Sequence, residues 1–87
     1  MVKLRVTKVT GEILEYKVTP VIEFSFEQYA KKGFQKAFLE DQKQSDVYWL
    51  AWEAMRRDGI TVPTFGASFL ETLEKVDIVV EEDNPNS

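Results

Sequence analysis

Apolar and polar residues alternate at the start of the chain. Val2, Leu4 and Val6 are separated by charged or polar residues, a period of two that is typical of a half-buried strand. The alternation resumes over residues 13–18, after a turn that contains glycine. The pattern therefore predicts an N-terminal antiparallel β-hairpin. We expect its pairing to end at Pro20, because proline has no amide hydrogen to donate to a sheet.

The pattern changes after the hairpin. Residues 21–25 fit either a third short strand or a lead-in to a helix, and we slightly favour the strand. Residues 26–32 have helical spacing, which Gly33 should interrupt. Helical spacing returns just after this glycine, so a bent or two-part helix is predicted across residues 26–40.

A second helix is predicted between Ser45 and Gly59. Ser45 fits the N-cap, since a hydroxyl can accept from the free amides of a first turn. Gly59 fits the position just past the end, where the backbone often turns left-handed. Arg56 and Arg57 fall in the last turn, where positive charge complements the helix dipole.

This helix is more apolar than one buried stripe requires. At 100° per residue, one broad arc holds the apolar residues Val47, Tyr48, Leu50, Ala51, Trp52, Ala54 and Met55. Trp49 falls on the opposite, polar arc, between Glu53 and Arg56. We therefore expect Trp52 to lie in the core. Trp49 fits the core or the surface about equally well on this evidence.

The sequence of the C-terminal part predicts an extended connection, a last helix, a short strand and a disordered tail. Residues 60–63 read as extended, and Thr64 as the cap of a helix whose apolar stripe is Phe65, Phe69, Leu73 and Val76. Residues 77–80 fit a final short strand. Residues 81–87 are acidic and contain proline and asparagine, so we expect a disordered tail. The fold class is then α+β, with a single domain over residues 1–80 in which the hairpin packs on two to three short helices.

Composition narrows the range of functions. A chain of 87 residues with 44% hydrophobic content has room for one modest core. Its net charge of −4 argues against a nucleic-acid binder, which needs a basic face. It has no cysteine, no apolar run that could span a bilayer and no signal peptide pattern, so we expect a cytoplasmic protein that does not act in a membrane.

Residues that usually carry catalysis are scarce. The chain has no histidine and no cysteine, and none of its serines lies in a nucleophile elbow. The carboxylates of Glu40 and Asp41, and those of residues 81–83, lack the spacing of a calcium loop. We therefore expect neither an enzyme nor a cofactor nor a metal. The remaining candidate is a protein-binding site at Trp49, Glu53 and Arg56, because Trp and Arg are frequent at interface hot spots.

Three stretches resemble a known family. The hairpin ends in Tyr-Lys-Val-Thr-Pro at residues 16–20, residues 48–59 read Tyr-Trp-Leu-Ala-Trp-Glu-Ala-Met-Arg-Arg-Asp-Gly, and residues 65–73 read Phe-Gly-Ala-Ser-Phe-Leu-Glu-Thr-Leu. In this order they resemble the small tail assembly chaperones of long-tailed bacteriophages, in particular those that infect actinobacteria. The resemblance spans most of the chain and depends chiefly on the Trp-Leu-Ala-Trp core.

The resemblance implies a non-enzymatic morphogenesis factor. Such proteins bind the phage tape measure protein, help recruit the tail-tube protein in the host cytoplasm, and are absent from the mature virion. Many exist in a short form and a frameshift-extended form, and this chain would be the short one. Self-association is compatible with this role. Two alternatives remain open: a small phage-encoded inhibitor that acts by surface binding, and a structural subunit of the head–tail connector.

Overall fold

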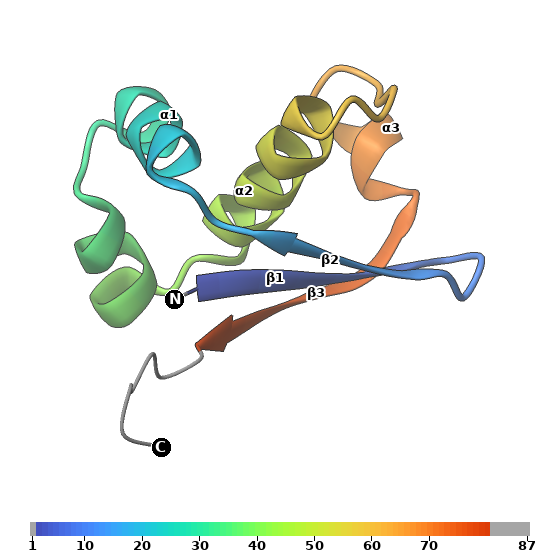
Figure 1. Ribbon diagram of the computed structural model, residues 1–87, viewed down its shortest axis with the longest axis horizontal. Helices are drawn as coiled ribbons and strands as arrows, with labels where there is room; N and C mark the ends of the chain where they lie inside the picture. Colours follow the sequence, from blue (N-terminus) through green and yellow to red (C-terminus); the bar gives the residue numbers. More distant parts are fainter. Residues whose placement is uncertain (1, 81–87) are drawn as a thin grey trace.

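The computed structural model describes residues 2–80, and it is an α+β fold (Figure 1). An antiparallel sheet of three strands lies below a layer of helices. The predicted hairpin is confirmed as β1 (Val2–Lys8) and β2 (Ile13–Lys17). The third strand is β3 (Leu73–Val80), which pairs with the other side of β1, so the order is β2-β1-β3.

One face of the sheet forms the floor of the core. Leu4 pairs with Tyr16 of β2 and with Ile78 of β3, and Val6 continues the same face. Leu4 and Val6 are fully buried, whereas Arg5 between them is exposed on the other face. The alternation in the sequence therefore predicts correctly which side of β1 meets the helices.

The favoured strand at residues 21–25 is wrong, because these residues belong to helix α1 (Pro20–Ala30). Proline at the first helical position costs no hydrogen bond, since its amide would have had no partner there. Thr19 is the N-cap, and its hydroxyl accepts from the amide of Ile22 at 3.4 Å. Pro20 thus ends the hairpin as predicted, and it does so by starting a helix.

The predicted two-part helix is confirmed, with its break at a different residue. Helix α1 ends at Ala30, and the C-cap is Lys31, which is left-handed at φ 59°, rather than Gly33. The carboxylate of Glu27 then accepts from the amide of Phe34 at 2.8 Å and holds the connecting segment against α1. The second part is η1 (Lys36–Asp41), a single stretch of π-helix.

Helix α2 (Gln44–Arg57) is the central helix of the upper layer (Figure 1). Ser45 is not its N-cap. That position belongs to Lys43, whose backbone is extended and whose carbonyl accepts from the amides of Asp46 and Val47 at 3.1 and 3.3 Å. The predicted end is confirmed, because Gly59 follows the helix with φ 84°.

The predicted last helix is mostly wrong. Helix α3 covers only Ala67–Leu70, and the chain then enters β3 instead of continuing the helical stripe to Val76. The amide of Val9 donates to the carbonyl of Thr72 at 3.0 Å, where β3 begins. Pairing with β1, some seventy positions earlier in the sequence, thus overrides the local helical spacing.

The core lies between the sheet and the helices. Its largest fully buried side chains come from every layer: Phe26 of α1, Leu50 and Met55 of α2, Phe69 of α3 and Leu4 of β1. These side chains hold the three helices in place over the sheet. The predicted disordered tail at residues 81–87 lies outside the described residues.

Candidate partner-binding surface

The structure buries two of the three predicted site residues. Trp49 is only 7% exposed and Glu53 only 2%, so the core is the observed alternative for Trp49, and neither side chain lies free on the surface as a directly contacting site residue would. The reason is that α1 packs beside α2 and covers this side. The ring of Tyr29 on α1 stacks on Trp49 with centroids 4.4 Å apart, and Phe26 approaches it edge-on at 6.0 Å.

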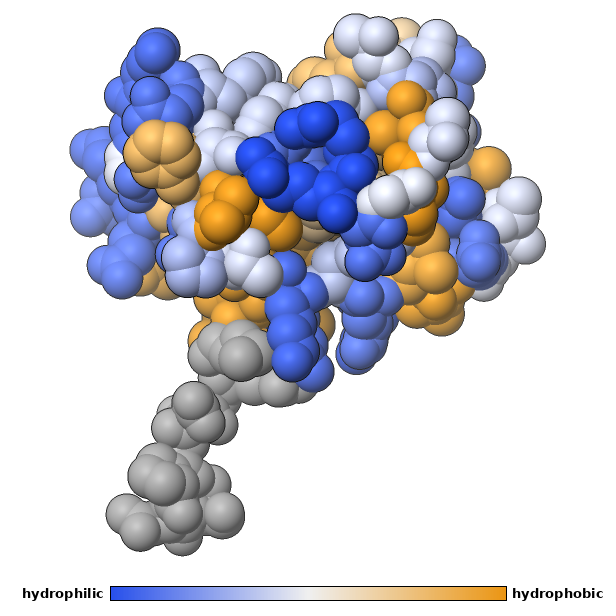
Figure 2. All heavy atoms as spheres, turned by 45° about the horizontal axis from the view of Figure 1, so that its top comes forward, coloured by the Kyte–Doolittle hydropathy of each residue, from blue (hydrophilic) through white to orange (hydrophobic). Residues whose placement is uncertain are grey.

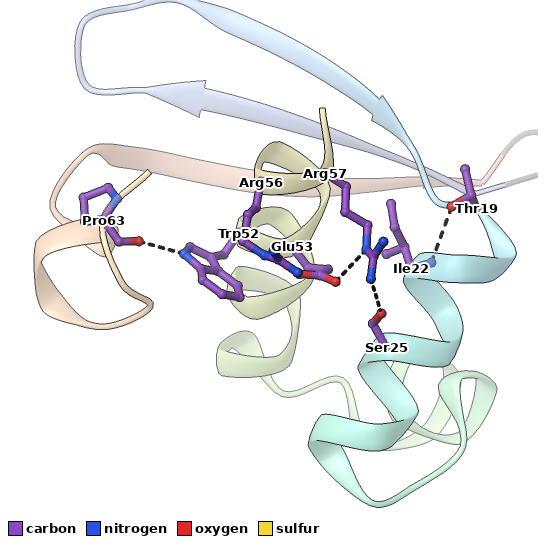
Figure 3. A network of polar contacts seen from close by, with 8 residues as sticks. All are labelled: Thr19, Ile22, Ser25, Trp52, Glu53, Arg56, Arg57 and Pro63. Atoms are coloured by element: carbon purple, nitrogen blue, oxygen red, sulfur yellow. Dashed lines mark hydrogen bonds and ion pairs between the residues drawn. The ribbon is translucent and has the colours of Figure 1, made fainter. Parts of the chain in front are cut away.

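Glu53 is held by two arginines (Figure 3). The Nε atom of Arg57 donates to Oε2 at 2.7 Å, and that of Arg56 donates to Oε1 at 3.0 Å. Arg57 also donates to the hydroxyl of Ser25 on α1 at 3.1 Å. The carboxylate therefore joins one turn of α2 to α1, and both arginines keep part of their side chains in water.

These contacts set the charge state of Glu53. Burial by itself would raise the pKa of the carboxyl group, because it removes water from the charged form. The hydrogen bonds from Arg57 and Arg56 outweigh burial, and the pKa of Glu53 lies below its ordinary value of 4.5. Glu53 is therefore ionised near neutral pH.

Trp52 faces solvent more than Trp49 does. It is only partly buried at the edge of the core. Its indole Nε1 donates to the carbonyl of Pro63 at 2.8 Å, and the guanidinium of Arg56 lies 5.5 Å from its ring centroid (Figure 3). Trp52, which was expected in the core, is thus only partly buried, whereas Trp49, for which core and surface were both open, lies in the core; Arg56 is exposed.

Three aromatic side chains from different segments meet at this surface. We call Tyr29, Trp52 and Phe65 the aromatic patch. Phe65 lies 6.0 Å from Trp52 and 6.5 Å from Tyr29 between ring centroids, so it links the loop before α3 to both helices. Tyr29 is 49% exposed, and the other two are partly buried. Trp49 lies in contact with two of them and supports the patch from the core side.

More apolar surface lies on the same layer of helices. Helix α1 exposes Val21 and Phe24, one turn apart, and Phe24 is 62% exposed. Figure 2 brings the helical side of the molecule forward and shows apolar groups on either side of a strongly hydrophilic cluster. The helical side therefore offers aromatic and aliphatic contact area beside positive charge, which suits binding to another protein.

The described part of the chain contains no cluster of three or more acidic residues arranged to hold a metal ion. Among residues 2–80, no helix is long and apolar enough to cross a bilayer.

Lys32 forms ion pairs with Asp41 at 3.1 Å and Asp46 at 2.9 Å, and thereby joins the end of η1 to the start of α2. The hydrogen bonds to Asp46 and Asp41 raise the pKa of Lys32, as expected for a lysine that fixes two helix ends.

Sequence reasoning missed Tyr29 and Phe65. Tyr29 follows Phe26 at helical spacing, and a helix counted from Pro20 would have placed it at the margin of the buried side. Phe65 was assigned to a helix stripe, whereas it lies in the turn before α3. No signal in the sequence indicates that these two rings and Trp52 come together, because the contact depends on how α1 packs against α2.

Comparisons with protein-family models, with curated proteins and with solved structures found no match.

Proposed function

We propose that this protein is a non-catalytic tail assembly chaperone, and that the aromatic patch binds the phage tape measure protein. The observation that carries the proposal is the convergence of Tyr29, Trp52 and Phe65 beside the half-exposed Arg56. Tyrosine, tryptophan and arginine are the residues most often found at interface hot spots. The family resemblance of residues 16–20, 48–59 and 65–73 supports the same function.

The chemistry of the partner fits this surface. A tape measure protein is long and helical, and its apolar stripes lie in water until the tail tube encloses them. An amphipathic helix can lay such a stripe across neighbouring apolar side chains, with anchors spaced one turn apart. The patch and the exposed Val21 and Phe24 of α1 offer contacts of this kind.

The predicted site residues take different roles in this proposal. Arg56 contacts the partner at the border of the patch, together with Trp52. Trp49 and Glu53 hold the contacting side chains in position. Trp49 stacks against Tyr29 from the core side, and Glu53 fixes the guanidinium of Arg56. A side chain that is held in place before binding loses less freedom when the partner arrives.

In this role the protein acts in the host cytoplasm before the tail is complete. It keeps the tape measure protein from aggregating and helps bring tail-tube subunits to it. It then leaves, so it is absent from the mature virion.

Co-expression with the tape measure protein of the same phage tests the proposal. The wild-type chain should increase the soluble fraction of the tape measure protein and co-purify with it. Tyr29→Ser should weaken that binding by about tenfold or more, since hot spots contribute about 2 kcal/mol. Leu39→Ser is the matched control, because Leu39 is an apolar side chain exposed on η1 at 69%, outside the patch. A wild-type chain without effect, or equal losses in both folded variants, would contradict the proposal.

A further inference from the structure

We infer that the outer edge of β3 pairs with a second copy of this chain, in antiparallel register centred on Val76, to give a continuous sheet of six strands. This inference concerns a side of the molecule that the aromatic patch does not use. It goes beyond the proposed function and does not depend on it.

The directions of the backbone groups follow from the hydrogen bonds of β1. The amide of Val18 donates to the carbonyl of Val2 at 2.9 Å, so the backbone N–H and C=O groups of the even-numbered residues of β1 point toward β2. The backbone groups of the odd-numbered residues, including Arg5, then point toward β3. Arg5 pairs with Asp77, so the backbone groups of Asp77 face β1, and those of Val76 and Ile78 face outward.

This outer edge is open. In the sheet order β2-β1-β3 the third strand is at the border, and within residues 2–80 no other segment forms a backbone hydrogen bond across that border. A hollow of about 360 Å³ lies next to it, and its lining residues are Phe38, Gln42, Gln44, Val47, Val76, Asp77 and Ile78. The same strand residues that offer free backbone groups thus also line an open hollow.

The two edges of the sheet differ in their protection. β2 has five residues and is followed by Pro20, and both features discourage pairing with another strand. β3 has eight residues, contains no proline and ends in Val80, which is 68% exposed. A long edge strand without proline is a template for strand addition.

The charge pattern of β3 is complementary to itself. In a register centred on Val76, Lys75 lies opposite Asp77 of the second copy, and Asp77 lies opposite its Lys75. Both side chains stand on the open face of the sheet and are about half exposed or more, where they now contact each other at 3.9 Å. The pairing therefore forms two ion pairs between chains, at positions where antiparallel strands bring side chains closest.

The apolar residues follow the same symmetry. Leu73 lies opposite Val79 of the second copy, and Val76 lies opposite its own counterpart. Glu74, which bulges out of the pairing with β1, lies opposite Ile78 of the second copy, so this position brings no like charges together. A register centred on Asp77 instead sets two carboxylates opposite each other, and opposed like charges destabilise a strand pair.

Charge reversal in β3 tests the inference. Sedimentation of the full chain between about 10 µM and about 1 mM, a range suited to a small interface, should show a monomer–dimer equilibrium. Lys75→Asp alone and Asp77→Lys alone should each weaken dimerisation by about tenfold, because each sets like charges opposite. The double variant Lys75→Asp/Asp77→Lys should restore the wild-type dimer to within about threefold.

Ile78→Pro provides a second, independent variant. It removes an amide that points outward, so it should abolish the dimer while circular dichroism shows the fold retained. Amide hydrogen exchange should protect Val76 and Ile78 only at high protein concentration, and Asp77 and Val79 at every concentration.

Three results would overturn the inference. The first is a chain that stays monomeric throughout this range, which would leave the edge to an extended segment of another protein. The second is a dimer that persists in Ile78→Pro. The third is a dimer that is insensitive to the single charge reversals, because it would have another register. None of these results would affect tape measure binding by the aromatic patch, so the two proposals fail separately.

Discussion

The two sides of α2 differ in what covers them. The side of α2 that carries Trp49 and Glu53 packs against α1. Tyr29 of α1 stacks on the indole of Trp49, and Ser25 of α1 lies beside Arg57, which binds the carboxylate of Glu53. The side of Trp52 meets the short loop before α3, through the carbonyl of Pro63 and the ring of Phe65. One helix therefore carries a buried polar side and a partly exposed aromatic side.

The polarity of a helix face does not by itself decide whether that face is exposed to solvent. Glu53 is buried although it is charged, because two arginines on its own helix neutralise it in place. Trp52 stays at the surface although it lies within the apolar arc, because the sheet and α1 take the other two sides of α2. Whether a side chain of α2 is buried therefore depends on which other elements of the fold pack against it.

Trp49→Ala should have the largest effect on stability. Removal of a buried indole that Tyr29 stacks on and Phe26 meets edge-on should lower the free energy of unfolding by about 3–5 kcal/mol. Chemical denaturation followed by circular dichroism measures the change. A midpoint close to that of the wild type would show that α1 does not cover this side.

Arg56→Gln/Arg57→Gln should cost almost as much at neutral pH. It leaves the buried carboxylate of Glu53 without its charged partners, at a cost of about 3 kcal/mol. Burial then dominates and should raise the pKa of Glu53 above 4.5, so the variant should gain stability relative to the wild type as pH falls from 7 toward 5.

The wild type should behave in the opposite way. The pKa of Glu53 in the wild type is depressed, so the contribution of this group to the free energy of unfolding is complete above pH 4.5. That contribution is lost as the pH falls below this value. Denaturation midpoints at several pH values compare the two proteins, with Arg56→Lys/Arg57→Lys as the charge-retaining control. Parallel pH profiles in all three would refute the role given to the arginines.

Trp52→Ala should cost less than Trp49→Ala, about 1–2 kcal/mol, because its side chain is only partly buried and loses one hydrogen bond. Binding to the tape measure protein should weaken by more than this loss of stability explains. Thermal melts beside a pull-down at a temperature where the variant is folded separate the two effects. Equal unfolding costs at the two tryptophans would remove the contrast between the sides.

The smallest expected effect is spectroscopic. Trp49→Phe and Trp52→Phe each leave one tryptophan, with little change in packing volume. Iodide should quench Trp52 in the first variant more strongly than Trp49 in the second, because the side chain of Trp52 is more exposed to solvent. Equal quenching in the two folded variants would contradict the burial described here.

Local patterns account for much of the fold. The period of two in β1 and β2, the helical spacing of α2 and the left-handed Gly59 are all visible in the sequence, because each depends on near neighbours. The final strand was predicted only over residues 77–80, and residues 73–76 were assigned to a helix, because the partner of β3 is β1, far away in the chain. The aromatic patch was missed for the same reason, since Tyr29 and Phe65 approach Trp52 only through tertiary packing.

The central position of β1 has a consequence for the order of folding. Of the three strands of the sheet β1 is synthesised first, yet one of its two neighbours comes more than sixty residues later. The hairpin can form early, but until β3 has been synthesised the side of β1 that carries the backbone groups of Arg5 stays open. Contacts between such distant segments form slowly. We therefore expect the nascent chain to pass through a helix-covered hairpin in which one edge of β1 is bare, and to cover this edge only when β3 docks.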